Sequence, residues 1–329
     1  MILSCSPLTR EKNKTRKYRN ALVLGGGGAK GFAHIGAIIT IEQENLHPDI
    51  ICGVSSGSIA GSFYALYYNK IKELHRIEET REFKILKKLK LNPVEMKQKQ
   101  GFFINFLSTI KRNMMFIKIL RDNALIHKED VEPVFRELFG DIKFEDIPIK
   151  LIAVAFDLVS GKDVYIQSGP LWKGILASCS IPGIFPPFEY NDMVLIDGGI
   201  TNRLPVKCAV LAGAENIIAI DISQPPSPGK NIESAVNLHL YIDELIAFRF
   251  DLYNKEMADI VLNPGLNDMK WHEFSKYNYA LEKGKDMVKE NLPVIKRVMK
   301  GKKYLYRKRL KRFLGHKNPA ILQEEFIFL

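Results

Sequence analysis

Ser55 is the side chain whose surroundings best suit nucleophilic chemistry. It lies between Gly53 and Gly57 in the sequence GVSSG, which matches the G-x-S-x-G pattern of a nucleophile elbow. In such an elbow, small neighbours let the serine occupy a sharp strand-to-helix turn with its hydroxyl exposed. The alternative is a serine-rich helix start capped by Ser55 or Ser56. The apolar run before the motif and the helical pattern after it favour the elbow.

A serine hydroxyl needs a base, and Asp197 is the best candidate. It precedes Gly198 and Gly199 and directly follows the apolar run 193–196. Partial desolvation would raise its pKa and make it a better base than an ordinary aspartate. The alternatives are a turn acid before two glycines and a Ser–Asp–His arrangement. Three histidines follow Asp197, but none lies in a predicted strand-end turn: His239, His272 and His316. We therefore predict a Ser55–Asp197 dyad, and we interpret the earlier His34 as a helix residue that packs or is solvated.

The third motif is GGGGAKG, residues 25–31, between a predicted strand and a predicted helix. A glycine loop at a helix start brings backbone N–H groups close to an anion. A P-loop is excluded because Gly31, and not serine or threonine, follows Lys30. A dinucleotide site needs an acid at the end of the second strand, and the nearest candidate, Asp49, precedes that strand. This position weakens the dinucleotide interpretation. The third option is an oxyanion hole, which needs backbone donors aimed at developing negative charge.

Strands and helices alternate along the chain and place each motif after a strand. The predicted strands are 20–24, 49–54, 150–156, 163–167, 193–196, 216–222 and 259–262. The predicted helices are 33–43, 58–68, 130–139, 232–257 and 279–299, and 71–126 is mostly helical and basic. This alternation predicts a three-layer α/β/α fold with a mostly parallel central sheet. The uncharged stretch 50–69 is long enough to span a bilayer, but its glycines and serines favour a strand, a turn and a packed helix.

The positive charge is concentrated in a few segments. The 329 residues include 48 Lys and Arg against 37 Asp and Glu, a net charge of +11. Basic clusters occupy 10–19, 84–99 and 300–312, and the last is interleaved with tyrosine, leucine and phenylalanine. Such a segment suits an anionic membrane surface, although a solvated helix face would have the same composition. We expect no nucleic-acid partner. Residues 102–116, rich in phenylalanine and methionine, could form a lid or a packed helical layer.

The sequence shows no pattern for a metal, a redox centre or secretion. None of the four cysteines lies in a C-x-x-C pair, which leaves a zinc site or a redox motif without support. Residues 157–163 lack the spacing of a calcium loop. The first nine residues are too short for a signal-peptide apolar region, and a basic stretch follows them. We therefore expect a cytoplasmic protein with no metal or cofactor, for which peripheral association with membranes is open.

The three motifs, in this order, resemble those of the patatin-like phospholipase family. Residues 177–187 (ASCSIPGIFPP) resemble the family's A-S-x-x-x-P-x-x-F-P-P block, and residues 197–206 (DGGITNRLPV) resemble its D-G-[AG]-x-x-N-x-x-P-V block. The resemblance covers about 20–289. It departs from the family pattern at Gly25, where plant members have aspartate, at Gly199, where many members have alanine, and at Arg203, where a second asparagine is frequent.

This resemblance implies a role for each motif. Ser55 would attack an ester carbonyl to form an acyl-enzyme, and Asp197 would take its proton. Backbone N–H groups around Gly26, Gly27 and Gly28 would stabilise the oxyanion, with Lys30 supporting the loop that ends at Gly31. Family members hydrolyse acyl esters of phospholipids and related lipids without a metal. Acyl transfer, a non-catalytic lipid- or partner-binding module and a nucleotide-binding protein remain as alternatives.

We expect three regions along the chain. Residues 1–19 form a basic arm, 20–294 form the catalytic domain with its motif-bearing core at about 20–212, and 295–329 form a basic amphipathic tail. The arm and the tail lie outside the resemblance. The head group, the acyl position and the oligomeric state are not encoded in any pattern that we recognise.

Overall fold

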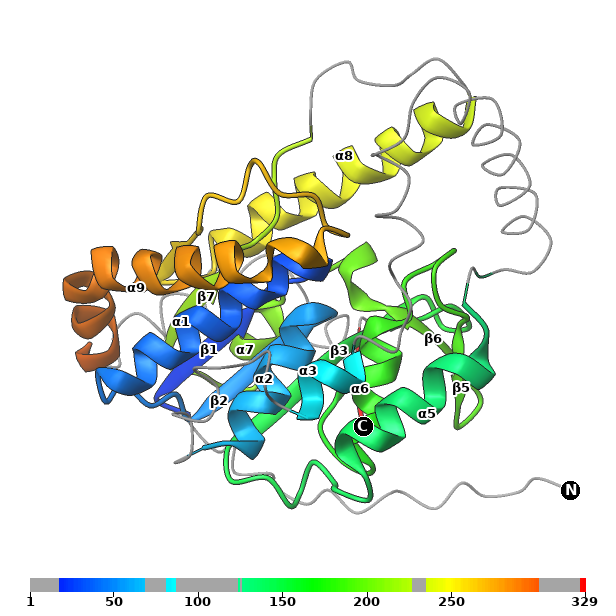
Figure 1. Cartoon of the computed structure of the whole chain (residues 1–329), viewed down its shortest axis with the longest axis horizontal. Coiled ribbons are helices and arrows are strands. Elements are labelled where there is room, and N and C mark those ends of the chain that lie inside the picture. The colour runs from blue at the N-terminus through cyan, green and yellow to red at the C-terminus, as the bar shows by residue number, and fades with distance from the viewer. Residues whose placement is uncertain (1–17, 69–80, 87–123, 125, 227–234, 302–325) are drawn as a thin grey trace, which may run out of the picture.

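A mixed sheet forms the centre of the molecule (Figure 1). The computed structural model describes residues 18–68, 81–86, 124, 126–226, 235–301 and 326–329. The main strand order is β5-β6-β3-β2-β1-β7-β8, and five adjacent strands of this path are parallel. These parallel strands are β1 (Asn20–Leu24), β2 (Ile50–Val54), β3 (Lys150–Asp157), β7 (Asn216–Ile220) and β8 (Ile260–Leu262). The predicted mostly parallel sheet is therefore confirmed.

Antiparallel strands extend the sheet beyond β3. The three strands that join it there are β4 (Lys162–Ile166), β5 (Phe188–Tyr190) and β6 (Met193–Asp197). Both β4 and β6 pair antiparallel with β3, and β5 pairs antiparallel with β6. At the outer edge, β9 (Phe326–Phe328) pairs parallel with β4. The chain end thus belongs to the sheet, although we expected a tail there.

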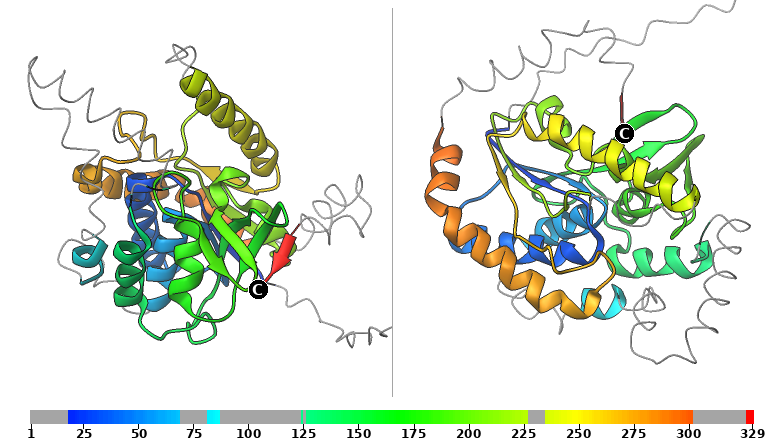
Figure 2. Two further views of the ribbon diagram at one scale, coloured as in Figure 1. Left: turned by 90° about the vertical axis from the view of Figure 1, so that its right-hand side faces the viewer. Right: turned by 90° about the horizontal axis from the view of Figure 1, so that it is seen from above.

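Helices cover both faces of the sheet (Figures 1 and 2). The larger core lies under α1 (Phe32–Gln43), α2 (Ser56–Leu66), α5 (Lys128–Phe139), α6 (Leu171–Cys179) and α9 (Tyr277–Lys300). The smaller core, on the other face, lies under α7 (Val206–Leu211). Two further helices are α3 (Arg81–Leu86) and α8 (Ala235–Lys255). The packing of both faces confirms the three-layer α/β/α architecture.

One expected boundary differs in the structure, whereas the uncharged stretch 50–69 folds as the sequence predicts. Helix α9 runs through Lys300, so the domain boundary that we expected between residues 294 and 295 falls inside a helix. The uncharged stretch 50–69 forms β2 and α2. In the part of the chain that the structure describes, no helix combines the length and the apolar character needed to cross a bilayer. The possible lid at 102–116 lies outside the described residues.

Strand register brings the serine and aspartate motifs together. Val54, at the end of β2, is aligned with Val154 of β3, and Ala155 of β3 is aligned with Asp197 of β6. Ser55 and Asp197 therefore flank the same point of β3. Because β6 is antiparallel, Asp197 approaches this point from the direction opposite to Ser55.

Candidate active site

Ser55 occupies a strained turn between β2 and α2. Its φ is 53° and its ψ is −126°, a conformation that residues with a side chain rarely adopt. Its backbone N–H donates to Ser178 of α6, to the carbonyl oxygen at 3.2 Å and to Oγ at 3.1 Å. Its carbonyl accepts a 2.7 Å bond from the Ser58 hydroxyl. The strained conformation is thus fixed from both sides.

The glycines of the elbow allow close backbone contact. A Cβ at Gly57 would lie 2.2 Å from the Leu24 carbonyl oxygen, and one at Gly53 would lie 2.6 Å from the Gly57 carbonyl oxygen. Both distances are far below van der Waals contact. A side chain at Gly57 would force the turn away from β1, and one at Gly53 would force β2 and the start of α2 apart. The G-x-S-x-G glycines are therefore required by packing between the elbow and the sheet.

Asp197 is buried beside Ser55, with 6% of its surface exposed. Its Oδ1 accepts a 2.8 Å bond from the Gly199 N–H, and its own N–H donates to the Ser180 carbonyl at 2.9 Å. Burial raises the pKa of its carboxyl group to about 6, while hydrogen bonds from the Ser55 side chain and the Gly199 N–H act in the opposite direction. Near neutral pH the carboxylate is therefore ionised, yet more basic than an ordinary aspartate.

The glycine loop lies directly beside Ser55. A Cβ at Gly26 would be 3.3 Å from the Ser55 Cβ. The Gly26 N–H already donates to the Arg203 carbonyl at 2.8 Å, and the Ala29 N–H donates to the Trp271 carbonyl at 2.6 Å. Among the described residues, the N–H groups of Gly27 and Gly28 have no hydrogen-bond partner.

This pattern of bonds changes one expectation. We expected N–H groups of Gly26, Gly27 and Gly28 to serve an oxyanion, but the donor of Gly26 is engaged in holding the loop. Gly28 has a φ of +58°, and a Cβ there would lie 2.4 Å from the Trp271 carbonyl oxygen, so this position needs glycine. Two free donors, from Gly27 and Gly28, remain available to an anion.

Lys30 and Gly31 continue the loop into buried surroundings. Burial lowers the pKa of Lys30 to about 8, although Asp221, Glu244 and Glu273 favour its charged form. Asp221 follows β7 and also forms a 2.6 Å ion pair with Lys255 of α8. A Cβ at Gly31 would lie 2.6 Å from the Ser56 Cβ. The loop is thus packed against the elbow on one side and electrostatically linked to α8 on the other.

Among the histidines, His34 contacts the glycine loop rather than the serine. Its Nε2 lies 2.8 Å from the Gly25 carbonyl oxygen, and burial lowers its pKa to about 4. The ring is therefore neutral near pH 7, and Nε2 carries the proton that it donates to Gly25. His272 packs edge-on against Trp271. His316 and the side chain of His239 lie outside the described residues.

A network beneath the aspartate loop was not foreseen from the sequence. The Asp163 carboxylate accepts bonds from the Thr201 hydroxyl at 2.6 Å and the Asn202 amide at 2.5 Å. Asn202 in turn accepts a 3.0 Å bond from the Asn254 amide of α8. These bonds hold the segment after Asp197 against β4 and α8. Asn202 belongs to the quoted block DGGITNRLPV, which was the only sequence signal for this network.

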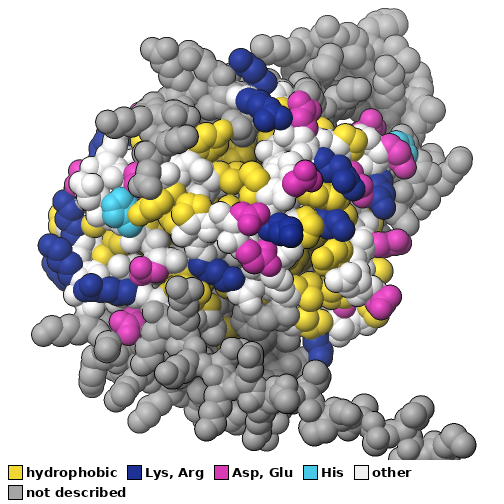
Figure 3. Space-filling model, turned by 90° about the horizontal axis from the view of Figure 1, so that it is seen from below, with side chains coloured by type: hydrophobic (Ala, Val, Ile, Leu, Met, Phe, Trp, Pro, Cys, Tyr) yellow, Lys and Arg dark blue, Asp and Glu magenta, His cyan; other side chains and the backbone are white. Residues whose placement is uncertain are grey.

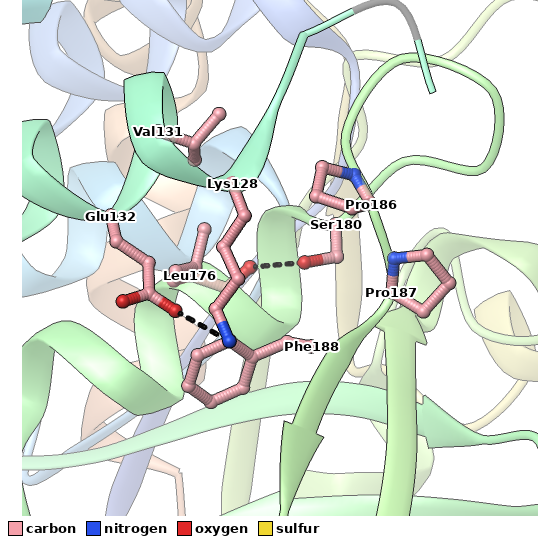
Figure 4. Close-up of a pocket in the computed structure, with 8 residues that line it drawn as sticks. All are labelled: Lys128, Val131, Glu132, Leu176, Ser180, Pro186, Pro187 and Phe188. Atoms are coloured by element: carbon pink, nitrogen blue, oxygen red, sulfur yellow. Dashed lines mark hydrogen bonds and ion pairs between the residues drawn. The ribbon is translucent and has the colours of Figure 1, made fainter. Parts of the chain in front are cut away.

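A small, shallow pocket adjoins the site without containing it. Figure 4 shows Lys128 and Glu132 of α5 on one side and the two prolines before β5 on the other. Its lining consists of Lys128, Val131, Glu132, Leu176, Ser180, Pro186, Pro187 and Phe188. Ser180 connects the pocket to the site because its carbonyl accepts the Asp197 N–H. In the described part of the chain, no group of three or more His, Cys, Asp or Glu side chains is arranged to hold a metal ion.

A comparison with protein families finds one match, to patatin-like phospholipase over residues 22–210. This region contains the elbow, the glycine loop and Asp197.

Curated relatives match at similar identity over different shares of their own length. Lysophospholipase NTE1 of Saccharomyces cerevisiae is 29% identical over 224 residues, which are 66% of this chain and 12% of the yeast protein. Lysophospholipase NTE1 of Candida albicans is 29% identical over 61% of this chain and 13% of the relative. An uncharacterized NTE family protein of Mycobacterium tuberculosis is 29% identical over 74% of this chain and 60% of the relative.

Among solved structures, VipD from Legionella pneumophila matches with a TM-score of 0.44 and 14% identity, over 84% of this chain and 67% of that chain. This likeness is too weak to bear on the activity.

Proposed function

Because this chain belongs to the patatin-like phospholipase family, we propose that it hydrolyses acyl esters of lipids through a Ser55–Asp197 dyad and an acyl-enzyme intermediate. The observation that carries the proposal is the pairing of a serine in a strained elbow with a buried aspartate of raised pKa. A nucleophile and a base in this relation are what acyl transfer to serine requires.

In the first half of the reaction, Ser55 Oγ attacks the ester carbonyl carbon and Asp197 accepts its proton. The carbonyl oxygen becomes negatively charged, and the N–H groups of Gly27 and Gly28 donate to it. The tetrahedral intermediate then collapses with cleavage of the carbon–oxygen bond of the ester. Asp197 returns the proton to the leaving alcohol, which leaves Ser55 acylated.

In the second half, water attacks the acyl-enzyme. Asp197 again accepts the proton, the same two N–H groups stabilise the second oxyanion, and the fatty acid leaves as Ser55 is reprotonated. The raised pKa of Asp197 suits both halves of the reaction. A carboxylate whose pKa is about 6 is ionised at neutral pH and still accepts a proton effectively. No step needs a metal ion.

The proposed substrates are phospholipids and lysophospholipids. Support comes from the family match and from the relatives in yeasts, which are named lysophospholipases. The chain spans only a small part of those relatives, so their activity is a proposal for this protein. Acyl transfer would use the same acyl-enzyme with an alcohol in place of water, and a product analysis that separates free fatty acid from transferred acyl groups distinguishes the two.

Fluorophosphonate labelling tests the nucleophile directly. We expect the wild type and Ser56→Ala to be labelled, and Ser55→Ala to remain unlabelled. Ser56 is the matched control because it is adjacent in sequence and its hydroxyl is also buried, without a hydrogen-bond partner among the described residues. Labelling of Ser55→Ala at wild-type level would overturn the assignment of Ser55.

A further inference from the structure

One face of α8 consists of exposed, large apolar side chains. Leu238, Ile242, Leu245, Ile246, Phe250 and Tyr253 recur at spacings of three and four residues, which places them along one side of the helix. Each is more than a third exposed, and Tyr253 reaches 64%. Figure 2 shows α8 on the outside of the molecule.

The opposite face of α8 is attached to the candidate active site. Ala247, Asp251 and Asn254 are buried. The Asn254 amide donates to Asn202, and the Lys255 ammonium group pairs with Asp221, whose charge also acts on Lys30. The outer apolar face is thereby held in a fixed relation to the aspartate loop and the glycine loop.

Two further exposed apolar residues lie at these same loops. Ile200 is three residues beyond Asp197 and is 48% exposed. Trp271 is 40% exposed, and its carbonyl accepts the Ala29 N–H of the glycine loop. Exposed apolar side chains therefore occur both on the outer face of α8 and at the loops, next to Asp197 and Gly28, to which its inner face is attached.

The described residues carry no excess of positive charge that could attract them to an anionic surface. In this part of the chain Asp and Glu outnumber Lys and Arg, and the positive excess resides in 1–17, 87–123 and 302–325. Figure 3 shows the face of the molecule away from α8, where acidic and basic side chains are interspersed rather than separated. Leucine, isoleucine, phenylalanine, tyrosine and tryptophan are the residues that enter the boundary between lipid head groups and acyl chains.

We propose that the outer face of α8, together with Ile200 and Trp271, docks on the surface of a lipid bilayer and brings the Ser55 site to its substrate. The inference rests on the proposed function for the identity of the substrate. It predicts a lipid interaction that does not depend on the charge of the head group.

Binding to vesicles of neutral phosphatidylcholine tests the proposal. The measurement is made on Ser55→Ala, to prevent hydrolysis, at about 1 M salt, where the Debye length is about 3 Å. We expect Ile246→Gln/Phe250→Gln to lower partitioning about tenfold or more, because burying one large apolar side chain is worth about that factor. The matched control, Leu158→Gln/Val159→Gln, changes two exposed apolar residues in the turn between β3 and β4, outside the proposed docking face, and should partition like its parent.

Tryptophan fluorescence provides a second measurement of docking on vesicles. The chain has two tryptophans, and Trp172 is buried, so Trp172→Phe leaves Trp271 as the sole reporter. Its emission should shift to the blue on addition of vesicles, and the shift should be lost with Ile246→Gln/Phe250→Gln.

The outcomes separate this inference from the proposed function. In the enzyme with Ser55, the α8 substitutions should reduce hydrolysis of vesicle lipid and leave hydrolysis of a water-soluble short-chain ester unchanged. Equal partitioning of parent and α8 variant would overturn the docking surface. A parent dimer that the α8 substitutions convert to a monomer, with no change in partitioning, would also overturn it and assign the face to a second copy. Loss of partitioning without ester hydrolysis by any form would support docking and contradict only the proposed function.

Discussion

The backbone amide of Ser55 donates to both the carbonyl oxygen and Oγ of Ser178, a residue 123 positions later in the chain. Ser178 Oγ donates in turn to the Val154 carbonyl at 2.7 Å. The elbow is therefore connected to the end of α6 and to β3, the strand that lies between β2 and Asp197. Through these bonds one side chain fixes the backbone of Ser55 relative to the strand that positions Asp197.

We expect Ser178→Ala to impair both stability and turnover. The substitution leaves the Val154 carbonyl without this donor and should lower the free energy of unfolding by about 1–3 kcal/mol. A small displacement of Ser55 should lower kcat about ten- to hundredfold with little change in KM. Urea denaturation and steady-state hydrolysis of a soluble ester measure the two effects.

Ser62→Ala provides the comparison for Ser178→Ala. Ser62 is equally buried, but its hydroxyl bonds only to the Ile59 carbonyl within α2, a type of bond that contributes little to helix stability. Its removal should leave kcat unchanged. Equal losses of kcat in the two variants would mean that the hydrogen bonds of the Ser178 hydroxyl do not position Ser55 for catalysis.

Because the backbone of Ser55 is strained, we expect glycine at this position to give a more stable protein than alanine, the reverse of the order inside a helix. At φ 53° and ψ −126°, Ser55→Gly should be more stable than Ser55→Ala by about 1 kcal/mol, because only glycine adopts this conformation without steric cost. At Ser62, inside α2, the order should reverse by about 1 kcal/mol because of helix propensity. Thermal unfolding of the four variants measures both differences, and alanine being the better residue at both positions would show that the elbow is unstrained.

The sequence predicted well those elements that local patterns encode. The run NALVL before the glycine loop corresponds to β1 residue for residue, and the elbow was located by its glycines and the apolar run before it. Helix α6 was missed because it is only nine residues long, and periodicity alone does not distinguish a short, mostly apolar helix from a buried strand. The three-residue strand β5 is too short to form a pattern.

The relation between the site residues depends on long-range pairing, which no local pattern reports. We inferred that Asp197 follows a strand, but the antiparallel direction of β6 was not encoded in the run MVLID. Likewise, the bond between Gly26 and the Arg203 carbonyl, which occupies one expected oxyanion donor, joins segments about 180 residues apart in the sequence. Motif order identified the participants, whereas register and packing determine which of their atoms remain free.

Asp197→Asn should abolish activity and stabilise the fold. Loss of the base should lower kcat about a thousandfold or more. The folded pKa of about 6 lies above the ordinary value of 3.8. Burial of the carboxylate therefore lowers the free energy of unfolding by an amount that grows from pH 4 to pH 6 and is constant above pH 6. Asparagine removes this cost, which gives a gain of up to about 3 kcal/mol at pH 8 and almost none below pH 4.

Urea denaturation of wild type and Asp197→Asn across this pH range measures that gain. For the wild type, kcat/KM should fall about tenfold per pH unit below pH 6, as the carboxylate becomes protonated. A gain in stability that does not depend on pH, or activity that persists well below pH 6, would contradict the assignment of the raised pKa to Asp197.

His34 should give stability the opposite pH dependence. Its folded pKa of about 4 lies below the ordinary value of 6.5, so folding favours the neutral ring, and stability is lost as pH falls from 6.5 towards 4. At pH 5 the loss should be about 2 kcal/mol relative to pH 8.

His34→Gln keeps a donor for the Gly25 carbonyl but does not titrate. Because Asp197 contributes with the opposite sign, the test is the difference between wild type and His34→Gln in unfolding free energy at pH 8 and at pH 5. A difference that is the same at both values would show that His34 is not held neutral by burial, and that its ring can be protonated without disturbing the glycine loop.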